Sequence, residues 1–160
     1  MVVKPSTRPT ATADAVFLRE LHDSVRRRDF AGLPEPLVRM LLDQQYSAFE
    51  AACRACPGLS DLVVELDGRP VGRVVVSETE PQIVILDLSL IEDARGLGIG
   101  SSLIEGLSEV ASRRGVPIRL HTDTGHRARR LYERLGFVVE EVREPTVQYV
   151  RHPRKRGELV

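Results

Sequence analysis

A short glycine-rich segment, residues 95–101, is the part of the chain best suited to chemistry. Its glycines, Gly96, Gly98 and Gly100, stand at alternate positions, and glycine lacks the Cβ atom that would hold a ligand away from the backbone. The apolar run 83–90 before it predicts a buried strand, and the apolar residues after it recur at helical spacing. A glycine turn between a strand and a helix can direct several backbone N–H groups at one anion beside the positive helix N-terminus. The segment therefore predicts a phosphate-binding loop whose ligand carries a pyrophosphate.

Two other phosphate-binding motifs fit these glycines less well. A Walker loop requires a lysine after its last glycine, and none follows here, which argues against hydrolysis of a nucleoside triphosphate. A dinucleotide fingerprint, G-x-G-x-x-G, begins correctly at Gly96 and Gly98 but has Ser101 in place of its third glycine. Asp123 lies roughly 20 residues on, where a ribose-binding acid is expected. Because the fit is partial, binding of a nicotinamide dinucleotide stays open as an alternative.

Two segments of the chain resemble motifs of one enzyme superfamily. Residues 88–103 contain R-x-x-G-x-G, from Arg95 through Gly98 to Gly100, and resemble motif A of the GNAT superfamily of acyl-CoA-dependent N-acetyltransferases. Residues 128–137 resemble motif B of the same superfamily, in which a helix that carries a tyrosine ends at Gly-Phe. The two motifs occur in the right order and at a suitable separation, which is more specific than either motif alone.

The resemblance implies an α+β fold with a mixed, mostly antiparallel sheet and helices on both faces. In that fold the strand before the glycine loop and the strand after its helix splay apart, and the pantetheine arm of coenzyme A lies in the gap. Acetyl-CoA is the implied cosubstrate, and its acetyl group passes to an amine by direct attack. The residues implied in its binding are Leu88, Leu90, Arg95, Gly96, Gly98, Ile99, Gly100 and Ser101.

The resemblance also implies roles in the reaction. Attack on the thioester places negative charge on its carbonyl oxygen, which a backbone N–H near Leu90 would stabilise. Tyr132 matches the tyrosine that approaches the sulfur of coenzyme A, and we assign it as the general acid. Val84 stands where some members have a glutamate, so the general base stays open. The candidates near the splayed strands are Asp87, Ser89 and His121.

Length and composition are those of a single cytoplasmic domain. The 160 residues suffice for one domain, 1–160, with a substantial core, and residues 1–12 and 152–160 are candidates for flexible ends. The 23 basic residues balance the 23 acidic ones, so no overall field favours nucleic acid or an anionic membrane. No apolar run approaches a membrane span, and no signal peptide begins at Met1. We expect neither a nucleic-acid nor a membrane partner, and a homodimer is compatible with the fold.

The first half of the chain predicts a short edge strand, two helices and a hairpin. The helices are expected over 14–28 and 36–56, where apolar residues recur at helical spacing. Asp67-Gly68 is a strong hairpin signal between two β-rich segments, and the strand 83–90 then completes an antiparallel meander. Two helices and a meander before the glycine loop argue against a Rossmann domain.

The second half predicts alternating elements after the glycine loop. The helix that follows this loop ends near Gly115 and crosses to a strand over 118–121, which should lie parallel to the strand 83–90. A further helix, which contains Tyr132, stops at Gly136 and is followed by a terminal hairpin.

Cys53 and Cys56 form a single C-x-x-C pair. They continue an apolar helical face, so both thiols are expected to face the core as small hydrophobic groups. The sequence has no second pair of cysteines and no histidines at the spacing of a compact zinc site. We therefore expect no metal.

The sequence does not select the acceptor amine. In the superfamily its pocket is usually built from variable N-terminal helices and hairpin loops, so a small amine, an antibiotic, an amino acid, a polyamine or a protein amino group are all open. Arg26, Arg27 and Arg28 could favour an acidic acceptor, although a charged helix end is the ordinary explanation. A catalytically silent acyl-CoA-binding regulatory module is a second hypothesis, against which the retained Tyr132 argues.

Overall fold

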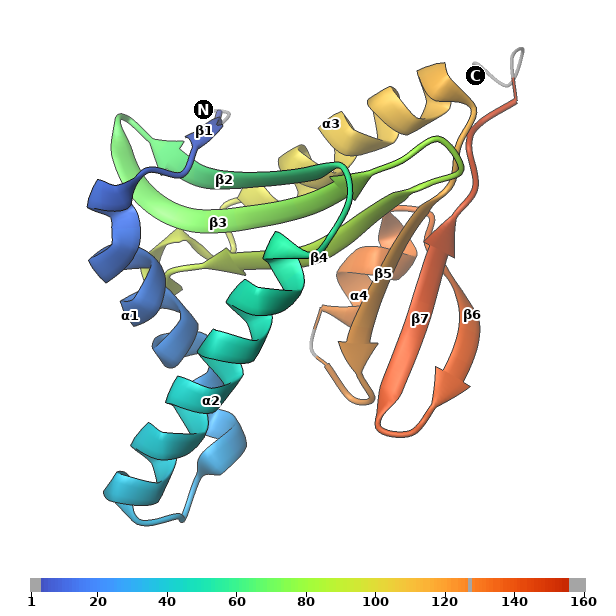
Figure 1. Cartoon of the computed structure of the whole chain (residues 1–160). Helices are drawn as coiled ribbons and strands as arrows, with labels where there is room; N and C mark the ends of the chain where they lie inside the picture. The colour runs from blue at the N-terminus through green and yellow to red at the C-terminus, as the bar shows by residue number, and fades with distance from the viewer. Residues whose placement is uncertain (1–3, 127, 156–160) are drawn as a thin grey trace.

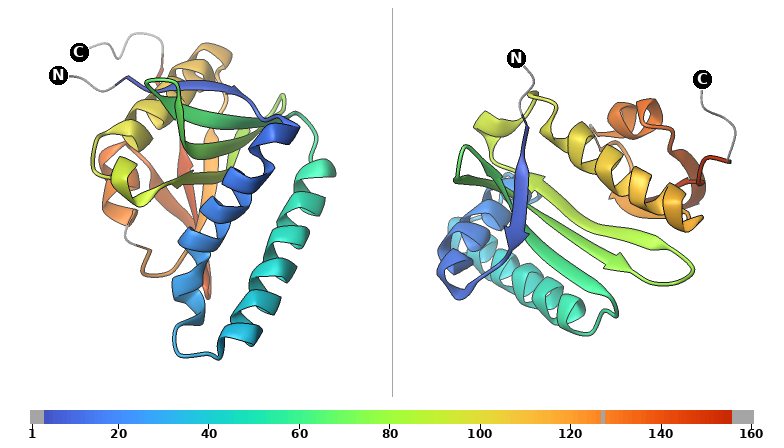
Figure 2. Two further views of the ribbon diagram at one scale, coloured as in Figure 1. Left: turned by 90° about the vertical axis from the view of Figure 1, so that its left-hand side faces the viewer. Right: turned by 90° about the horizontal axis from the view of Figure 1, so that it is seen from above.

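The computed structural model describes residues 4–126 and 128–155 and has a seven-stranded sheet between two layers of helices (Figure 1). The strands are β1 Ser6–Pro9, β2 Leu59–Leu66, β3 Arg69–Glu78, β4 Ile83–Leu90, β5 Ile118–Asp123, β6 Val138–Arg143 and β7 Thr146–Arg151. The helices are α1 Ala15–Arg26, α2 Glu35–Arg54, α3 Ile99–Arg114 and α4 Arg129–Arg134. α1 and α2 cover one face of the sheet, and α3 and α4 cover the other (Figure 2), which confirms the expected layers.

The strand order is β1-β2-β3-β4-β5-β7-β6, and every neighbouring pair is antiparallel except β4 and β5. The β2–β3 hairpin turns at Asp67 and Gly68, whose φ angles are 52° and 76°. Positive φ at both positions of a two-residue turn suits Asp-Gly and matches the twist of the flanking strands. β1 pairs with β2 at the edge of the sheet, where Pro9 is tolerated. The expected meander, parallel pair and terminal hairpin are thus confirmed.

Leu86 forms a bulge in the middle of β4. Its neighbours Ile85 and Asp87 lie opposite consecutive residues of β3, so Leu86 has no partner in that strand. An extra residue reverses the alternation of side chains along the rest of a strand. Leu88 therefore packs against the same core cluster as Ile85, whereas Asp87 and Ser89 face α1 and α2.

The parallel pairing of β4 and β5 is short. Residues 83–85 lie opposite residues 118–120, and the strands separate beyond this point, where the bulge bends β4. The expectation that residues 83–90 form a nearly unbroken buried strand is wrong for the second half. Leu86 is 38% exposed and residues 87–90 are half-buried, because β5 no longer covers that edge.

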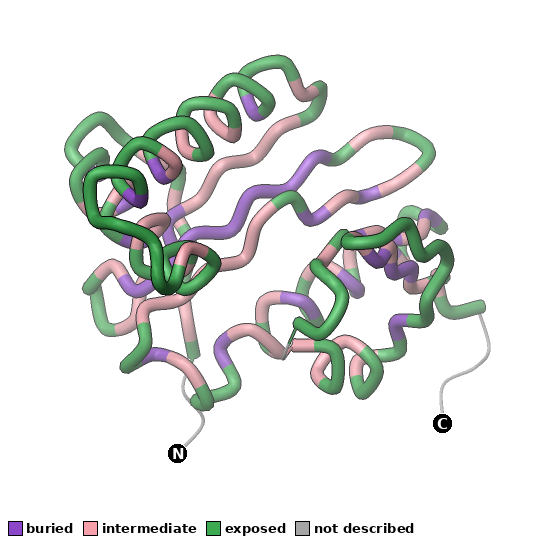
Figure 3. The backbone as a smooth tube through the Cα atoms, turned by 90° about the horizontal axis from the view of Figure 1, so that it is seen from below, coloured by how far each residue is buried: buried purple, intermediate pink, exposed green. Residues whose placement is uncertain are grey.

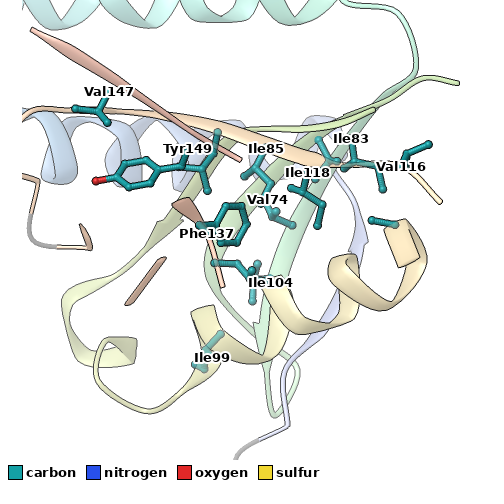
Figure 4. Packing of buried hydrophobic residues seen from close by; sticks show 14 of the residues in the cluster. Val74, Ile83, Ile85, Ile99, Ile104, Val116, Ile118, Phe137, Val147 and Tyr149 are labelled. Atoms are coloured by element: carbon teal, nitrogen blue, oxygen red, sulfur yellow. The ribbon is translucent and has the colours of Figure 1, made fainter. Parts of the chain in front are cut away.

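The main core lies between the sheet and α3. Ile99, Ile104 and Ala111 of α3 are buried in one cluster with strand residues and with Phe137 (Figure 4). Along the backbone tube the central strands carry many of the buried positions, and the outer turns of the helices are exposed (Figure 3). α3 ends at Gly115, whose φ of 70° is the left-handed conformation that glycine adopts readily at a helix end.

The two cysteines lie at the C-terminal end of α2 and just after it. Cys53 is buried and Cys56 is half-buried, and burial raises the pKa of the Cys53 thiol to about 11, so this thiol stays protonated at neutral pH. Among residues 4–126 and 128–155, no group of three or more histidines, cysteines and acids is placed to hold a metal ion. None of the helices within these ranges is long and apolar enough to cross a membrane.

A buried arginine joins α2 to the sheet. Arg73 of β3 is 3% exposed and donates hydrogen bonds to both carboxylate oxygens of Asp61, at 2.9 and 2.7 Å, and to Glu50 of α2 at 2.9 Å. Its guanidinium carbon also lies over the Phe49 ring, 5.3 Å from the centroid. A buried charge is tolerated when it is paired and hydrogen-bonded in this way.

Arg73→Ala should lower the free energy of unfolding by about 3 kcal/mol or more, the range for removing one partner of a buried ion pair. The substitution leaves the carboxylates of Asp61 and Glu50 without their cation, and it opens space beside Phe49. Chemical denaturation measures the change. Arg143→Ala is the matched control, because Arg143 pairs with Glu141 on the surface, and it should leave the midpoint nearly unchanged. Equal loss in both variants would contradict a structural role for Arg73.

Candidate active site

The predicted glycine loop connects β4 to α3 and leaves backbone donors open. Gly96 and Gly98 have φ angles of 73° and 81°, which explains glycine at both positions, and an added Cβ at either would meet nothing within 4 Å. The N–H of Ser102 donates to the carbonyl of Gly98 at 3.0 Å, closing the first helical turn. The N–H groups of Ile99, Gly100 and Ser101 precede this bond and have no helical acceptor. The loop can therefore bind an anion at the start of α3.

Arg95 and Ile99 contribute to this loop in different ways. The Nε of Arg95 donates to the carbonyl of Leu90 at 3.1 Å, which ties the loop to the end of β4. The Arg95 side chain also lines a pocket of about 380 Å³ against α1. Ile99 is 1% exposed, so its side chain anchors α3 in the core and only its backbone faces the loop.

The backbone of Leu88 and Leu90 faces the gap between β4 and β5. The N–H of Ile91 donates to the carbonyl of Val71 in β3 at 2.8 Å, and Leu90 lies opposite Gly72. In an antiparallel ladder the residues alternate between those that bond their partner and those that face away. Leu88 and Leu90 are of the second kind, so their N–H and C=O groups point to the edge that β5 has left.

Tyr132 of α4 lies beside this gap in an aromatic cluster. Its ring is 6.0 Å from that of Phe137 and 5.7 Å from that of Tyr149, between centroids. The pKa of the Tyr132 phenol is raised above 10.0, first by burial and then by the negative charge of Asp87. The phenol is therefore protonated at neutral pH and can donate a proton.

A second pocket, of about 300 Å³, lies on the opposite face of β4, under α1 and α2. Its apolar walls are Leu18, Leu21, Val25, Ala48 and Phe49. Its polar lining comprises His22, Arg26, Gln45, Arg73, Asp87 and Ser89. A small pocket with apolar walls and a few convergent polar groups is typical of a site for a small molecule.

The structure separates His121 from the other two candidate bases. Asp87 and Ser89 lie together in this pocket, where the Ser89 hydroxyl donates to Asp87 Oδ1 at 2.9 Å. Burial raises the pKa of Asp87, while the Ser89 hydrogen bond and the charges of Arg26, Arg73 and His22 oppose that shift. His121 is exposed on β5, and its Nε2 lies 2.8 Å from the side-chain oxygen of Gln148. Asp87 is thus the candidate that combines access to the pocket with a pKa shifted toward that of a useful base.

Sequence reasoning did not identify the pocket or the role of Arg73 in forming it. Arg73 stands alone among the valines of β3, and a single charge in an otherwise apolar strand is a signal that could have been used. The pocket residues of α1 and α2 carry no comparable signal, because they fit an ordinary amphipathic pattern.

Asp87→Asn should raise the free energy of unfolding at neutral pH, because burial penalises the charged carboxylate and the amide has no charge. The pKa of Asp87 in the folded protein lies above the ordinary value of 3.8. The increase in the free energy of unfolding, relative to wild type, should therefore appear as the pH rises above 3.8. It should be complete above the pKa of Asp87 in the folded protein. Chemical denaturation at several pH values measures it.

Asp14→Asn is the matched control, because it should change the free energy of unfolding in the opposite direction. Arg8 donates to both oxygens of Asp14 at 2.8 Å, and with the Ala11 amide it lowers the pKa of Asp14 to about 2. This substitution should lower the free energy of unfolding at neutral pH, and the loss should fade as the pH falls from 3.8 toward 2. Destabilisation of the same size in both variants would contradict the burial of the Asp87 charge.

Comparison with known proteins identifies the family of this chain. The chain matches the acetyltransferase (GNAT) family model over residues 18–137. No curated protein sequence matches it significantly.

Solved structures share its fold over nearly the whole chain. The PaiA N-acetyltransferase of Thermoplasma acidophilum in complex with coenzyme A has a TM-score of 0.73 and 16% identity, covering 93% of this chain and 99% of that one. An acetyltransferase of Thermus thermophilus has a TM-score of 0.68 and 21% identity, covering 94% and 98%. The ribosomal-protein-S18-alanine N-acetyltransferase of Escherichia coli has a TM-score of 0.64 and 15% identity, covering 98% and 99%. With its family match and its splayed strand pair, the chain belongs to the GNAT family of acetyltransferases.

Proposed function

We propose that this protein transfers an acetyl group from acetyl-CoA to a primary amine by direct attack. The observation that carries the proposal is that two groups suited to proton transfer lie on opposite faces of the sheet beside the gap between β4 and β5. Asp87 lines the pocket under α1 and α2, yet its charge raises the pKa of Tyr132, which α4 supplies on the other face. Substrates that approach from opposite faces of the sheet would meet between them.

The donor would be held by backbone groups. The N–H groups of Ile99, Gly100 and Ser101, with the positive end of α3, suit a pyrophosphate. The conformations of Gly96 and Gly98 keep the loop in this shape, and Arg95 ties it to β4. The pantetheine arm would then hydrogen-bond to Leu88 and Leu90 along the open edge of β4.

The reaction would proceed by addition and elimination. The neutral amine nitrogen attacks the thioester carbon, and the N–H of Leu90 stabilises the negative charge on the carbonyl oxygen. Asp87 accepts the proton that the nitrogen loses as the N–C bond forms. The C–S bond then breaks, and the departing thiolate takes the proton of the Tyr132 phenol, which solvent later restores. The products are an N-acetylated amine and free coenzyme A.

Two alternatives make different demands on the structure. A silent acyl-CoA-binding module needs the glycine loop but neither Asp87 nor Tyr132, so placing both groups at the gap favours an enzyme. A nicotinamide dinucleotide would suit a doubly wound parallel sheet. β4 and β5 are the one parallel pair among the described strands, which argues against that ligand.

Gly98→Ala should weaken acetyl-CoA binding about tenfold, comparable to losing one hydrogen bond to a charged group. Alanine is strained at a φ of 81° and would shift the loop amides. Isothermal titration calorimetry measures the dissociation constant. Gly106→Ala is the matched control, because Gly106 lies inside α3 with nothing within 4 Å of an added Cβ. Binding of NADH in place of acetyl-CoA, or equal loss in both variants, would contradict the proposed donor site.

Asp87→Asn and Tyr132→Phe should each lower kcat by about 10²-fold or more, the usual contribution of a positioned acid or base. The release of free coenzyme A thiol, measured with saturating acetyl-CoA and a panel of amines, gives kcat. Asp87→Asn should also abolish the rise of kcat/KM with pH that deprotonation of Asp87 produces. His121→Gln is the matched control and should retain full turnover.

Other outcomes of this assay would contradict specific parts of the proposal. Full turnover in Tyr132→Phe would overturn the role of Tyr132 as acid. Loss of activity in His121→Gln with full activity in Asp87→Asn would move the base to His121. Binding of acetyl-CoA without thiol release for any amine would favour the silent module.

A further inference from the structure

We infer that the pocket under α1 and α2 selects an acceptor that carries both a primary amine and a carboxylate on an apolar body, that is, an amino acid. In this inference Arg26 binds the carboxylate and Asp87 receives the amine. It rests on the proposed function, because it names the substrate class of the same site.

Opposite charges stand at separate places in the pocket. Asp87 lies on β4 beside the gap, and Arg26 lies in the last turn of α1. The two make no ion pair with each other, yet Arg26 is close enough for its charge to lower the pKa of Asp87. A ligand lying between them could place its ammonium or amine group toward Asp87 and its carboxylate toward Arg26.

Arg26 is the cation of this pocket that remains available. Arg73 is bound to Asp61 and Glu50, and the Nδ1 of His22 lies 3.2 Å from Asp23. Within residues 4–126 and 128–155, Arg26 has no carboxylate within ion-pair distance, and its side chain is exposed at the pocket. An exposed guanidinium without an acidic partner is well suited to bind a ligand carboxylate through two parallel hydrogen bonds.

The remaining lining argues against other amines. A polyamine or an aminoglycoside carries several positive charges, and the charge of Arg26, unpaired within the described part of the chain, would disfavour them here. Glu50 and Asp61 are already engaged with Arg73, so Asp87 is the acid that remains for a cation. The apolar walls formed by α1 and α2, with the small volume of about 300 Å³, favour one apolar side chain rather than a sugar or a folded protein surface.

The test compares matched ligands that differ in their carboxylate. L-phenylalanine and L-phenylalaninamide share the amine and the ring, and 5-aminopentanoate and pentylamine form a second pair with a longer spacing between the charges. Calorimetry on the full chain saturated with coenzyme A gives their dissociation constants, and thiol release from acetyl-CoA gives kcat/KM. Arg26→Gln is compared with Arg27→Gln, whose parent residue pairs with Glu35 at 2.9 Å and does not line this pocket.

Within at least one pair, we expect wild-type protein to bind the carboxylate-bearing member about tenfold or more tightly than its partner. Arg26→Gln should remove that preference by weakening the carboxylate-bearing member alone, and Arg27→Gln should leave it unchanged. The preference is the ratio of the values for the two ligands of a pair, measured in the same protein. A difference in the intrinsic reactivity of the two amines changes this ratio equally in wild type and variant, so it does not affect the comparison between them. Binding of no probe, or a preference that survives in Arg26→Gln, would overturn the inference.

The two readouts separate this inference from the proposed function. Thiol release with the amines that lack a carboxylate, at a rate that Arg26→Gln leaves unchanged, would overturn the amino-acid class and leave acetyl transfer standing. Selective binding of the carboxylate-bearing ligands without any thiol release would support the class of ligand and overturn acetyl transfer.

Discussion

The bulge at Leu86 is the feature on which the rest of the site depends. One unpaired residue in β4 bends the strand away from β5 and ends their pairing after residue 85. The same residue reverses the side-chain alternation, so that Leu88 stays in the core under α3 while Asp87 turns toward α1 and α2. A regular strand would keep its edge paired and would direct Asp87 into the apolar core. A single local irregularity therefore creates both an open backbone edge and a carboxylate beside it.

Each face of the sheet then has a separate task. On one face, α3 is packed rigidly through Ile99 and Ile104, which fixes its N-terminal amides relative to the end of β4. On the other face, Arg73 holds α2 to β2 and β3 through Asp61 and Glu50, and Arg73 itself lines the pocket. The proposed donor and acceptor sites thus rest on different contacts, so the acceptor pocket can vary without disturbing the loop that binds the donor.

Features set by local chemistry could be predicted from the sequence. The Asp67-Gly68 hairpin and the glycine loop follow from backbone conformations that few other residues adopt, and the parallel pair follows from the order strand, helix, strand. The bulge was harder to predict, because residues 83–90 contain no glycine or proline to mark it. Its one sign in the sequence is that Asp87 and Ser89 would share a face with the buried Ile83 and Ile85 in a regular strand. Arg26 and Arg27 are adjacent residues of the same type, so the sequence alone does not distinguish their roles. The packing of α1 places Arg26 in the pocket and lets Arg27 pair with Glu35.

The central claim is that the open edge of β4 and the start of α3 together hold the donor. Titration of ¹⁵N-labelled protein with acetyl-CoA, followed by NMR of the backbone amides, tests it most directly. We predict saturable shifts at Leu88 and Leu90 as well as at Ile99, Gly100 and Ser101, with one common dissociation constant. Saturable binding that leaves the amides of Leu88 and Leu90 unmoved, or shifts that cluster elsewhere, would contradict it.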